Sequence, residues 1–168
     1  MVNLTADSNG TYEWINGSIM NAERTKALCI VDEDKDTLYA IAGTSNKTME
    51  TLDISSSDSS WTLLDGNHDT LEHELCCGRA MLYGEYIFLV GSQTTTSAAE
   101  IFVMDRDTQY VSSPNGLSLQ FDRVGASSMI IGDILYVLSG RNVNGTGLTS
   151  WEYVCLDDNW YDSYYLVY

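Results

Sequence analysis

The sequence predicts an all-β protein built from about three repeated units, each of them a four-stranded antiparallel sheet. Ser and Thr are abundant and helix-forming residues are sparse, which is typical of β-rich proteins. Short apolar runs alternate with turn signals, among them Gly-Asp at 132–133. The same order of features returns with a period of about 50 residues. Composition, turn spacing and period therefore predict the same fold class.

Four sequence markers recur in one order along the chain. An apolar run ending in Gly occurs as LYAIAGT, YIFLVGS and ILYVLSGR, with the glycines 48 and 49 residues apart. A later run ends on Asp three times, at intervals of 52 residues. A basic residue opens each unit, and an aromatic residue marks its last strand. The markers are Gly43, Gly91 and Gly140; Asp53, Asp105 and Asp157; Arg24, Arg79 and Arg123; and Trp14, Trp61, Tyr110 and Trp160.

Each unit contains the pattern of four strands in succession. In the third unit these are GASSMII, ILYVLSG, SWEYVCL and the segment at Trp160. A tight turn joins the first two strands: DEDKD at 32–36 in the first unit, Gly-Glu at 84–85 in the second and Gly-Asp at 132–133 in the third. The second strand is apolar at nearly every position, which predicts burial on both of its faces.

These features resemble the kelch family of β-propellers, whose blades repeat at about this period. The resemblance covers residues 24 to about 161, and Trp14 extends it by part of a blade. Kelch blades usually carry a Gly pair after the second strand, and here the second glycine is replaced by Thr44, Ser92 and Arg141. The resemblance implies about three full kelch-like blades and one extra N-terminal strand.

The predicted boundaries follow the markers. They are an N-terminal segment with the last strand of a preceding blade at 1–22, blade 1 at 23–65, a polar linker at 66–78, blade 2 at 79–122, and blade 3 with a C-terminal aromatic strand at 123–168. A propeller closes with about four to eight blades. The sequence is therefore a stretch of a longer propeller, or several chains close one ring, or blades stack into an open assembly by strand exchange.

The chain is strongly acidic, with 24 acidic against 8 basic residues and a formal charge of −16. This balance excludes nucleic acid and an anionic membrane surface as partners, because both need a basic patch. No apolar run approaches 18 residues, so no membrane insertion is expected. The first ten residues have neither the basic nor the apolar region of a signal peptide.

Five Asn-x-Ser/Thr sequons predict N-linked glycans in exposed loops and in the polar N-terminal segment. Asn-Gly turn chemistry explains three of them without any sugar. The candidate acceptors are Asn3, Asn9, Asn16, Asn46 and Asn144, and the Asn-Gly pairs are those at 9, 16 and 144. The run TTTSAA at 94–99 is a weak signal for O-linked sugar.

The four cysteines are disulfide candidates, because an even count suits an oxidising compartment. Cys76 and Cys77 are adjacent and poorly placed to bridge each other, so each would pair with Cys29 or Cys155. Alternatively, Cys29 and Cys155 are buried thiols on apolar strands. No Cys-x-x-Cys spacing is present, which argues against structural zinc.

Two acidic segments carry residue types that could bind a metal. Asp32, Asp34 and Asp36 alternate along one turn and form a weak calcium candidate, although an acidic hairpin turn explains them as well. His68 and His73 lie with acidic residues in the predicted linker, where a solvated loop is favoured over a metal site.

The sequence carries no nucleophile elbow, phosphate-binding loop or supported pair of catalytic carboxylates, so no enzyme is expected. Some kelch-like propellers are copper radical oxidases, but two histidines in one linker do not supply their ligand set. We expect a non-catalytic extracellular or cell-surface glycoprotein module with a structural or adhesive role. It would act within a homo-oligomeric or filamentous assembly, with itself or another chain completing the propeller.

Two alternatives remain open. One is an intracellular kelch-type adaptor that binds a protein partner, and the other is a carbohydrate-binding or oxidase-like propeller domain. No cofactor is expected beyond N-linked glycans and the calcium candidate.

Overall fold

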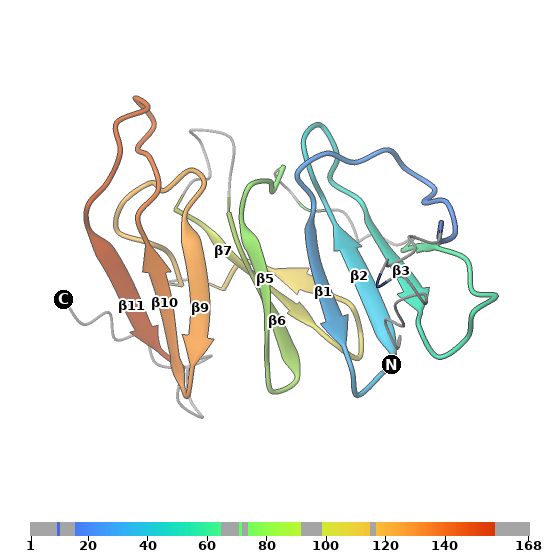
Figure 1. The fold of residues 1–168 in the computed structure, drawn as a ribbon. Coiled ribbons are helices and arrows are strands. Elements are labelled where there is room, and N and C mark those ends of the chain that lie inside the picture. Colours follow the sequence, from blue (N-terminus) through green and yellow to red (C-terminus); the bar gives the residue numbers. More distant parts are fainter. Residues whose placement is uncertain are drawn as a thin grey trace.

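The computed structural model describes residues 10, 16–64, 71, 74–91, 99–114 and 117–156. Within these residues every regular element is a β-strand, and the strands form three antiparallel sheets, which confirms the all-β, propeller-blade fold class (Figure 1). We refer to the sheets as blades 1, 2 and 3 in chain order.

Each blade is a meander in which consecutive strands pair. Blade 1 consists of β1 (Leu28–Asp32), β2 (Thr37–Ile41), β3 (Met49–Asp53) and β4 (Thr62–Leu63). Blade 2 consists of β5 (Arg79–Tyr83), β6 (Tyr86–Val90), β7 (Ile101–Asp105) and β8 (Val111–Ser112). The described part of blade 3 consists of β9 (Ser127–Ile131), β10 (Ile134–Leu138) and β11 (Trp151–Cys155).

The pairing registers align the three blades position by position. In each blade the first residue of the first strand lies opposite the last residue of the second strand, which lies opposite the first residue of the third. The three corresponding trios are Leu28, Ile41 and Met49; Arg79, Val90 and Ile101; and Ser127, Leu138 and Trp151. Positions elsewhere in the blades can be compared by counting from these trios.

When the three blades are aligned, one residue of the basic marker is out of register. Arg24 and Arg123 each lie four residues before the first strand of their blade, whereas Arg79 is the first residue of β5. The position of the two arginines is occupied in blade 2 by Leu75. The prediction that Arg79 is the blade 2 copy of this marker is therefore wrong. Connections of unequal length hide the true register from a count along the sequence.

Two other markers also shift when they are placed in register. Asp53, Asp105 and Cys155 correspond at the end of the third strand. Trp61, directly before β4, corresponds to Val111, the first residue of β8. Tyr110 lies one position before this aromatic site, and Cys155 replaces the predicted third Asp. The markers Asp157, Trp14 and Trp160 lie outside the described residues.

In blades 1 and 3 the bend after the second strand spans two residues with left-handed backbone conformation, whereas the glycine marker of blade 2, Gly91, aligns with Ala42 and Ser139 and not with the other two glycines. Ala42 and Gly43 have φ of 51° and 123°, and Ser139 and Gly140 have 60° and 96°. The two-residue bend thus lies at 42–43 and 139–140, one position earlier than the resemblance suggested. Thr44 and Arg141 follow the bend instead of belonging to it, and Ser92 lies outside the described residues.

Neighbouring blades pack face to face through apolar side chains. Blade 1 contacts blade 2 through a cluster that includes Tyr39 and Ile41 on one side and Leu89 and Phe102 on the other. Blade 2 contacts blade 3 through a second cluster, in which Phe88 meets residues of β10 and β11. The first strands of the blades, β1, β5 and β9, lie next to one another, as Figure 1 shows.

The described part of the predicted polar linker packs inward. Leu71 and Leu75 are buried in the cluster between blades 1 and 2. Their backbones are also fixed, because Leu71 N donates to Lys47 O and Gly43 N donates to Leu75 O. His68 and His73 of this segment lie outside the described residues.

Candidate interaction surface at the blade faces

The outer face of blade 3 carries large apolar side chains that are exposed to solvent. Strand pleating places alternate residues of β9, β10 and β11 on this face. Ile131 is 61% exposed, Trp151 56% and Met129 39%. The whole face, which we call the blade 3 face, consists of Ser127, Met129, Ile131, Ile134, Tyr136, Leu138, Trp151, Tyr153 and Cys155.

Three aromatic rings form the centre of the blade 3 face. Trp151 stacks on Tyr153 with ring centroids 5.6 Å apart, and Tyr136 lies 6.2 and 6.1 Å from these two rings. Packed aromatic rings are a common feature at the centres of protein interfaces, since they bury a large area with few rotatable bonds.

The corresponding face is buried in the two preceding blades. In blade 1 it carries Leu28, Tyr39 and Ile41, each at most 1% exposed because blade 2 covers them. In blade 2 it carries Phe88 and Val90, which blade 3 covers. The blade 3 face therefore has the character of an inter-blade surface that no following blade covers among the described residues.

The opposite end of the array presents the complementary surface. This surface, which we call the blade 1 face, carries Cys29, Val31, Leu38, Ala40, Glu50 and Leu52, of which Ala40 and Glu50 are buried. Val31 is 40% exposed. The corresponding face of blade 2 includes Ile87 and Leu89, which are fully buried against blade 1.

A polar contact fastens each pair of neighbouring blades at one edge. Arg106, directly after β7, makes a bidentate ion pair with Asp32 at the end of β1, with N···O distances of 2.7 and 2.5 Å. At the same positions of the next pair, the Tyr83 hydroxyl donates to the Leu156 carbonyl. In blade 3 the position of Asp32 is held by Ile131, and in blade 1 the position of Arg106 is held by Ile54. Both isoleucines are exposed.

Two of the three aspartates of the weak calcium candidate take part in this contact. Asp32 is fully buried against Arg106, and Asp34 accepts a further bond from Arg106 at 3.1 Å. The Arg106 hydrogen bonds hold the Asp32 pKa below its usual value although burial opposes this. Asp36 lies exposed in the turn with φ of 48°. Asp32 and Asp34 thus belong to the ion pair with Arg106. Among the described residues no three metal-ligating side chains converge.

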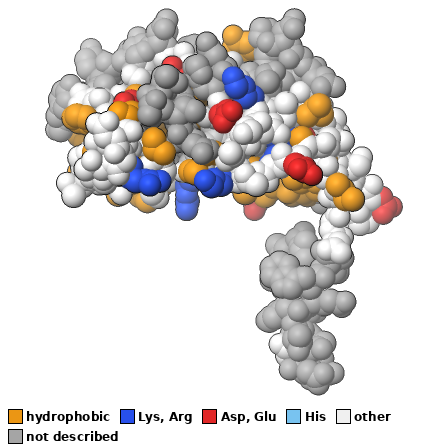
Figure 2. Space-filling view, turned by 90° about the horizontal axis from the view of Figure 1, so that it is seen from above, with side chains coloured by type: hydrophobic (Ala, Val, Ile, Leu, Met, Phe, Trp, Pro, Cys, Tyr) orange, Lys and Arg blue, Asp and Glu red, His pale blue; other side chains and the backbone are white. Residues whose placement is uncertain are grey.

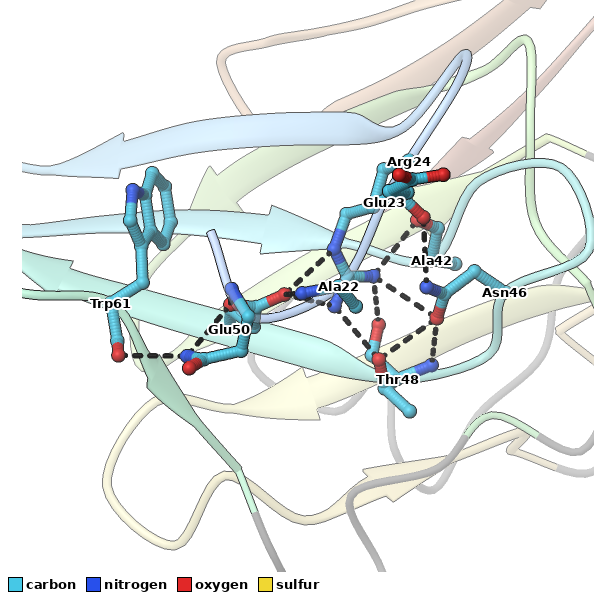
Figure 3. Close-up of polar contacts among 9 residues, drawn as sticks. Ala22, Glu23, Arg24, Ala42, Asn46, Thr48, Glu50 and Trp61 are labelled. Atoms are coloured by element: carbon cyan, nitrogen blue, oxygen red, sulfur yellow. Dashed lines mark hydrogen bonds and ion pairs between the residues drawn. The ribbon is translucent and has the colours of Figure 1, made fainter. Parts of the chain in front are cut away.

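Inside blade 1 a buried arginine organises the loops at one end of the sheet (Figure 3). Arg24 donates to Glu50 at 2.9 Å and to the carbonyls of Ala42 and Thr48 at 3.0 and 2.6 Å. The Ala42 carbonyl belongs to the left-handed bend, which aims it at the guanidinium. Burial raises the Glu50 pKa, but bonds from Asn21, Arg24 and Ala22 outweigh it, and the net effect is a lowered pKa.

Blade 3 repeats this arrangement with partners at the same positions. Arg123 donates to Glu152 at 2.7 Å and to the carbonyls of Ser139 and Ser150 at 2.8 and 2.9 Å. These three partners occupy the positions of Glu50, Ala42 and Thr48 in the aligned registers. In blade 2 the charged pair is replaced by Leu75 and Phe102, both buried in the same apolar cluster.

The described sequons differ in their surroundings. Asn46 lies within the Arg24 network, where its Oδ1 accepts from Thr48 N at 2.8 Å and its Nδ2 donates to Glu23 O at 3.3 Å. Asn144 and Asn16 are exposed, and Asn144 lies in the loop after β10. Asn3 and Asn9 lie outside the described residues, as do residues 94–98 of the Ser/Thr run.

The cysteines do not pair as the disulfide hypothesis required in this structure. None of the four forms a disulfide. Cys29 and Cys155 are exposed on β1 and β11, so the alternative of buried thiols is wrong for both. Cys76 is buried, and its Sγ lies 3.2 Å from Sγ of Cys77.

In the face seen from above in Figure 2, hydrophobic side chains lie among single Lys, Arg, Asp and Glu side chains. Among the described residues, no helix meets the length and apolarity needed to cross a bilayer.

Sequence reasoning missed the glutamates and Arg106. Glu50 and Glu152 are second in the third strand of blades 1 and 3, a recurrence that the sequence contains. Their absence from blade 2 concealed it. Arg106 gave no signal, because its partner Asp32 lies 74 residues away.

Comparison with solved structures identifies the fold. No protein-family model matches the sequence, and no curated protein matches it. Among solved structures 119 chains match, including the one described as "Structure of YjhT", with a TM-score of 0.59 and 16% identity. YjhT is a β-propeller-type protein. The chain has the fold of β-propeller blades. The match covers 74% of this chain and 36% of YjhT, so the chain spans about a third of that propeller.

Proposed function

We propose that the protein is a non-catalytic structural module of a homo-oligomeric assembly, in which the blade 3 face of one copy docks on the blade 1 face of another. The observation that carries this proposal is the exposed apolar surface around Ile131 and Trp151, 61% and 56% exposed. Exposed apolar patches rimmed by polar residues commonly mark interaction sites.

The chain itself supplies the template for this contact. Its two internal interfaces both join the face equivalent to the blade 3 face with the face equivalent to the blade 1 face. A second copy presents the blade 1 face in the same chemical form, so no new kind of contact is required. Two copies docked reciprocally would place six blades in one ring, within the range of about four to eight at which propellers close.

The backbone supports the kelch type of blade. A glycine pair after the second strand provides left-handed backbone without steric cost, which is why such bends favour glycine. Here the pair of left-handed residues is kept, with Ala42 and Ser139 in the first place and Gly43 and Gly140 in the second. The carbonyls of Ala42 and Ser139 accept from buried arginines, which helps to stabilise the non-glycine residues in this conformation.

We further propose that the module is secreted or displayed at the cell surface and carries N-linked glycans. The exposed sequons at Asn16 and Asn144 support this proposal. Asn46 is the weaker acceptor, because its amide is engaged in the Arg24 network.

Sedimentation equilibrium of the full chain tests the docking. A dimer at micromolar concentration is expected, and Trp151→Glu should dissociate it by placing a charge at the centre of the blade 3 face. Val143→Glu is the matched control, since Val143 is exposed and apolar in the same blade but lies in the loop after β10.

A wild-type monomer at these concentrations would count against the proposal. So would a dimer that Trp151→Glu leaves intact. Tryptophan quenching of such a monomer by glycans would instead favour a carbohydrate-binding domain.

Glycosylation needs a separate measurement. Secretion from a eukaryotic host followed by intact mass before and after enzymatic deglycosylation should show a mass loss, which Asn144→Gln reduces. An unchanged mass would contradict the extracellular glycoprotein proposal while leaving the docking proposal standing.

A further inference from the structure

The segment that leads into blade 2 carries two adjacent thiols in close contact. Sγ of Cys76 and Sγ of Cys77 lie 3.2 Å apart, and no disulfide joins them. A disulfide bond needs about 2.05 Å between the sulfur atoms. The two sulfur atoms are therefore only about 1.2 Å beyond bonding distance.

The repeat itself holds this dipeptide in its conformation. Cys77 has a left-handed backbone with φ of 58°, and it lies two residues before the first strand of its blade. The same position is left-handed in the other blades, where Lys26 has φ of 56° and Gly125 has 65°. The conformation is thus a property of the blade and does not depend on cysteine.

Neighbouring contacts fix the backbone on both sides of the pair. Cys77 N donates to Lys26 O at 3.4 Å, and Leu75 O accepts from Gly43 N at 2.9 Å. Directly after the pair, Gly78 packs so closely on Gly91 that a Cβ on Gly91 would lie 2.6 Å from the Gly78 Cα. With the chain held before, within and after the pair, the two sulfur atoms stay near each other.

We propose that Cys76 and Cys77 form a reversible vicinal dithiol–disulfide couple that small-molecule disulfides, such as oxidised glutathione, convert to the bridged form. The remaining thiols offer no comparable partner, because Cys29 and Cys155 are exposed on outward faces of blades 1 and 3.

The oxidation proceeds by two thiol–disulfide exchanges. Cys77, which is the less buried of the pair, attacks one sulfur of oxidised glutathione as the thiolate, forming a mixed disulfide and releasing one glutathione. Cys76 then loses its proton and attacks Sγ of Cys77, which forms the Cys76–Cys77 bond and releases the second glutathione. Two electrons pass to the oxidant, and the two thiol protons leave with the two reduced glutathione molecules.

The two thiols differ in the way this order requires. Burial, together with the neighbouring Cys77, raises the pKa of Cys76 to about 11, so Cys76 stays protonated at neutral pH. Only the thiolate is nucleophilic. Cys76 is therefore a poor first nucleophile, and it reacts only once the mixed disulfide lies directly beside it and its proton has been lost.

We expect the Cys76–Cys77 disulfide to form reversibly and not to be a permanent cross-link. Adjacent Cα atoms are about 3.8 Å apart, below the range of about 4.4–6.8 Å common for disulfides. Such departures make a disulfide more reducible, and easily reduced disulfides are the regulatory ones. We therefore expect low concentrations of reductant to reopen it.

Phenylarsine oxide, which bridges two neighbouring thiols, tests the pair in the folded wild-type protein. One arsenical per chain is expected, with protection of Cys76 and Cys77 from alkylation. Incubation with oxidised glutathione should remove two hydrogens from the peptide that contains both residues, and mild reductant should restore them. The other blades provide substitutions that suit the backbone: Cys76→Thr from blade 1 and Cys77→Gly from blade 3. Either should abolish arsenical binding, and Cys76→Thr should accumulate a glutathione adduct on Cys77.

Cys29→Ser/Cys155→Ser is the matched control and should leave arsenical binding and bridge formation unchanged. The proposal is overturned if both adjacent thiols remain fully alkylatable in excess oxidised glutathione. It is equally overturned if peptide mapping joins either of them to Cys29 or Cys155, or if the wild-type protein binds no arsenical.

Discussion

We predict that the buried Arg123–Glu152 ion pair can be replaced by the apolar pair that blade 2 has at the same positions. The variants are Arg123→Leu, Glu152→Phe and the combination of both, which copy Leu75 and Phe102 of blade 2. Arg123 is 1% exposed and donates four hydrogen bonds, to Glu152, Ser139 O, Ser150 O and Ser150 Oγ.

The magnitude follows from what each substitution leaves behind. Arg123→Leu leaves the Glu152 carboxylate without its cation and two carbonyls without their donor. Breaking a buried ion pair in this way costs about 3–5 kcal/mol. The double variant removes both charges and adds apolar contact, so it should be less destabilised than Arg123→Leu by about 2 kcal/mol, a typical coupling for residues in contact.

Urea unfolding followed by tryptophan fluorescence measures these free energies from the midpoint and slope. The same cycle at Arg24 and Glu50 serves as a comparison, because Glu50 accepts from two backbone amides, those of Asn21 and Ala22, whereas Glu152 accepts from one, that of Gln120. Additive effects of the two single substitutions, or a loss below about 1 kcal/mol for Arg123→Leu, would refute the reasoning.

Three further predictions follow from other contacts. Asp32 and Glu50 have pKa values below their ordinary values of 3.8 and 4.5, so the stabilisation they provide is present above those values and lost as the pH falls through the lower folded pKa. The urea midpoint should therefore drop as the pH falls below about 4.5, and Asp32→Asn should flatten that dependence. Gly78→Ala should lower the free energy of unfolding by about 3 kcal/mol, because a Cβ would lie 1.9 Å from Val90 O. Gly132→Ala is the control and should cost about 1 kcal/mol, because a Cβ there meets nothing within 4 Å. Similar shifts of the urea midpoint for the two variants would contradict this account. Arg106→Leu should lower stability by about 3–5 kcal/mol, since Asp32 stays buried without its cation, and a neutral result in thermal unfolding would show that the contact between blades 1 and 2 does not depend on this pair.

The fold class was predictable because a repeat of about 50 residues multiplies weak signals. The apolar second strands and the turns at 84–85 and 132–133 locate their hairpins directly. Position within the repeat was harder, since connections of unequal length shifted Arg79 and Asp157 out of phase. Only the strand pairing shows that Leu75 and Cys155 hold the corresponding positions.

The candidate surface was less accessible to sequence reasoning. Trp151 and Ile131 are residue types that also occur in core strands, and the strand pattern alone does not reveal which face of a sheet a neighbouring blade covers. Long-range partners were also hidden: Asp32 belongs to a run that resembles a calcium loop, and only the fold brings Arg106 to it. The close approach of Cys76 and Cys77 depends on the left-handed residue at 77, which the repeat imposes.

A density map of the assembled full chain tests the central claim most directly, because it counts the blades around the axis. The docking account predicts a closed ring of six blades with two-fold symmetry, in which Trp151 of each copy is covered by the blade 1 face of the other. A particle of three blades with Trp151 open to solvent, or a ring completed by a different polypeptide, would contradict it.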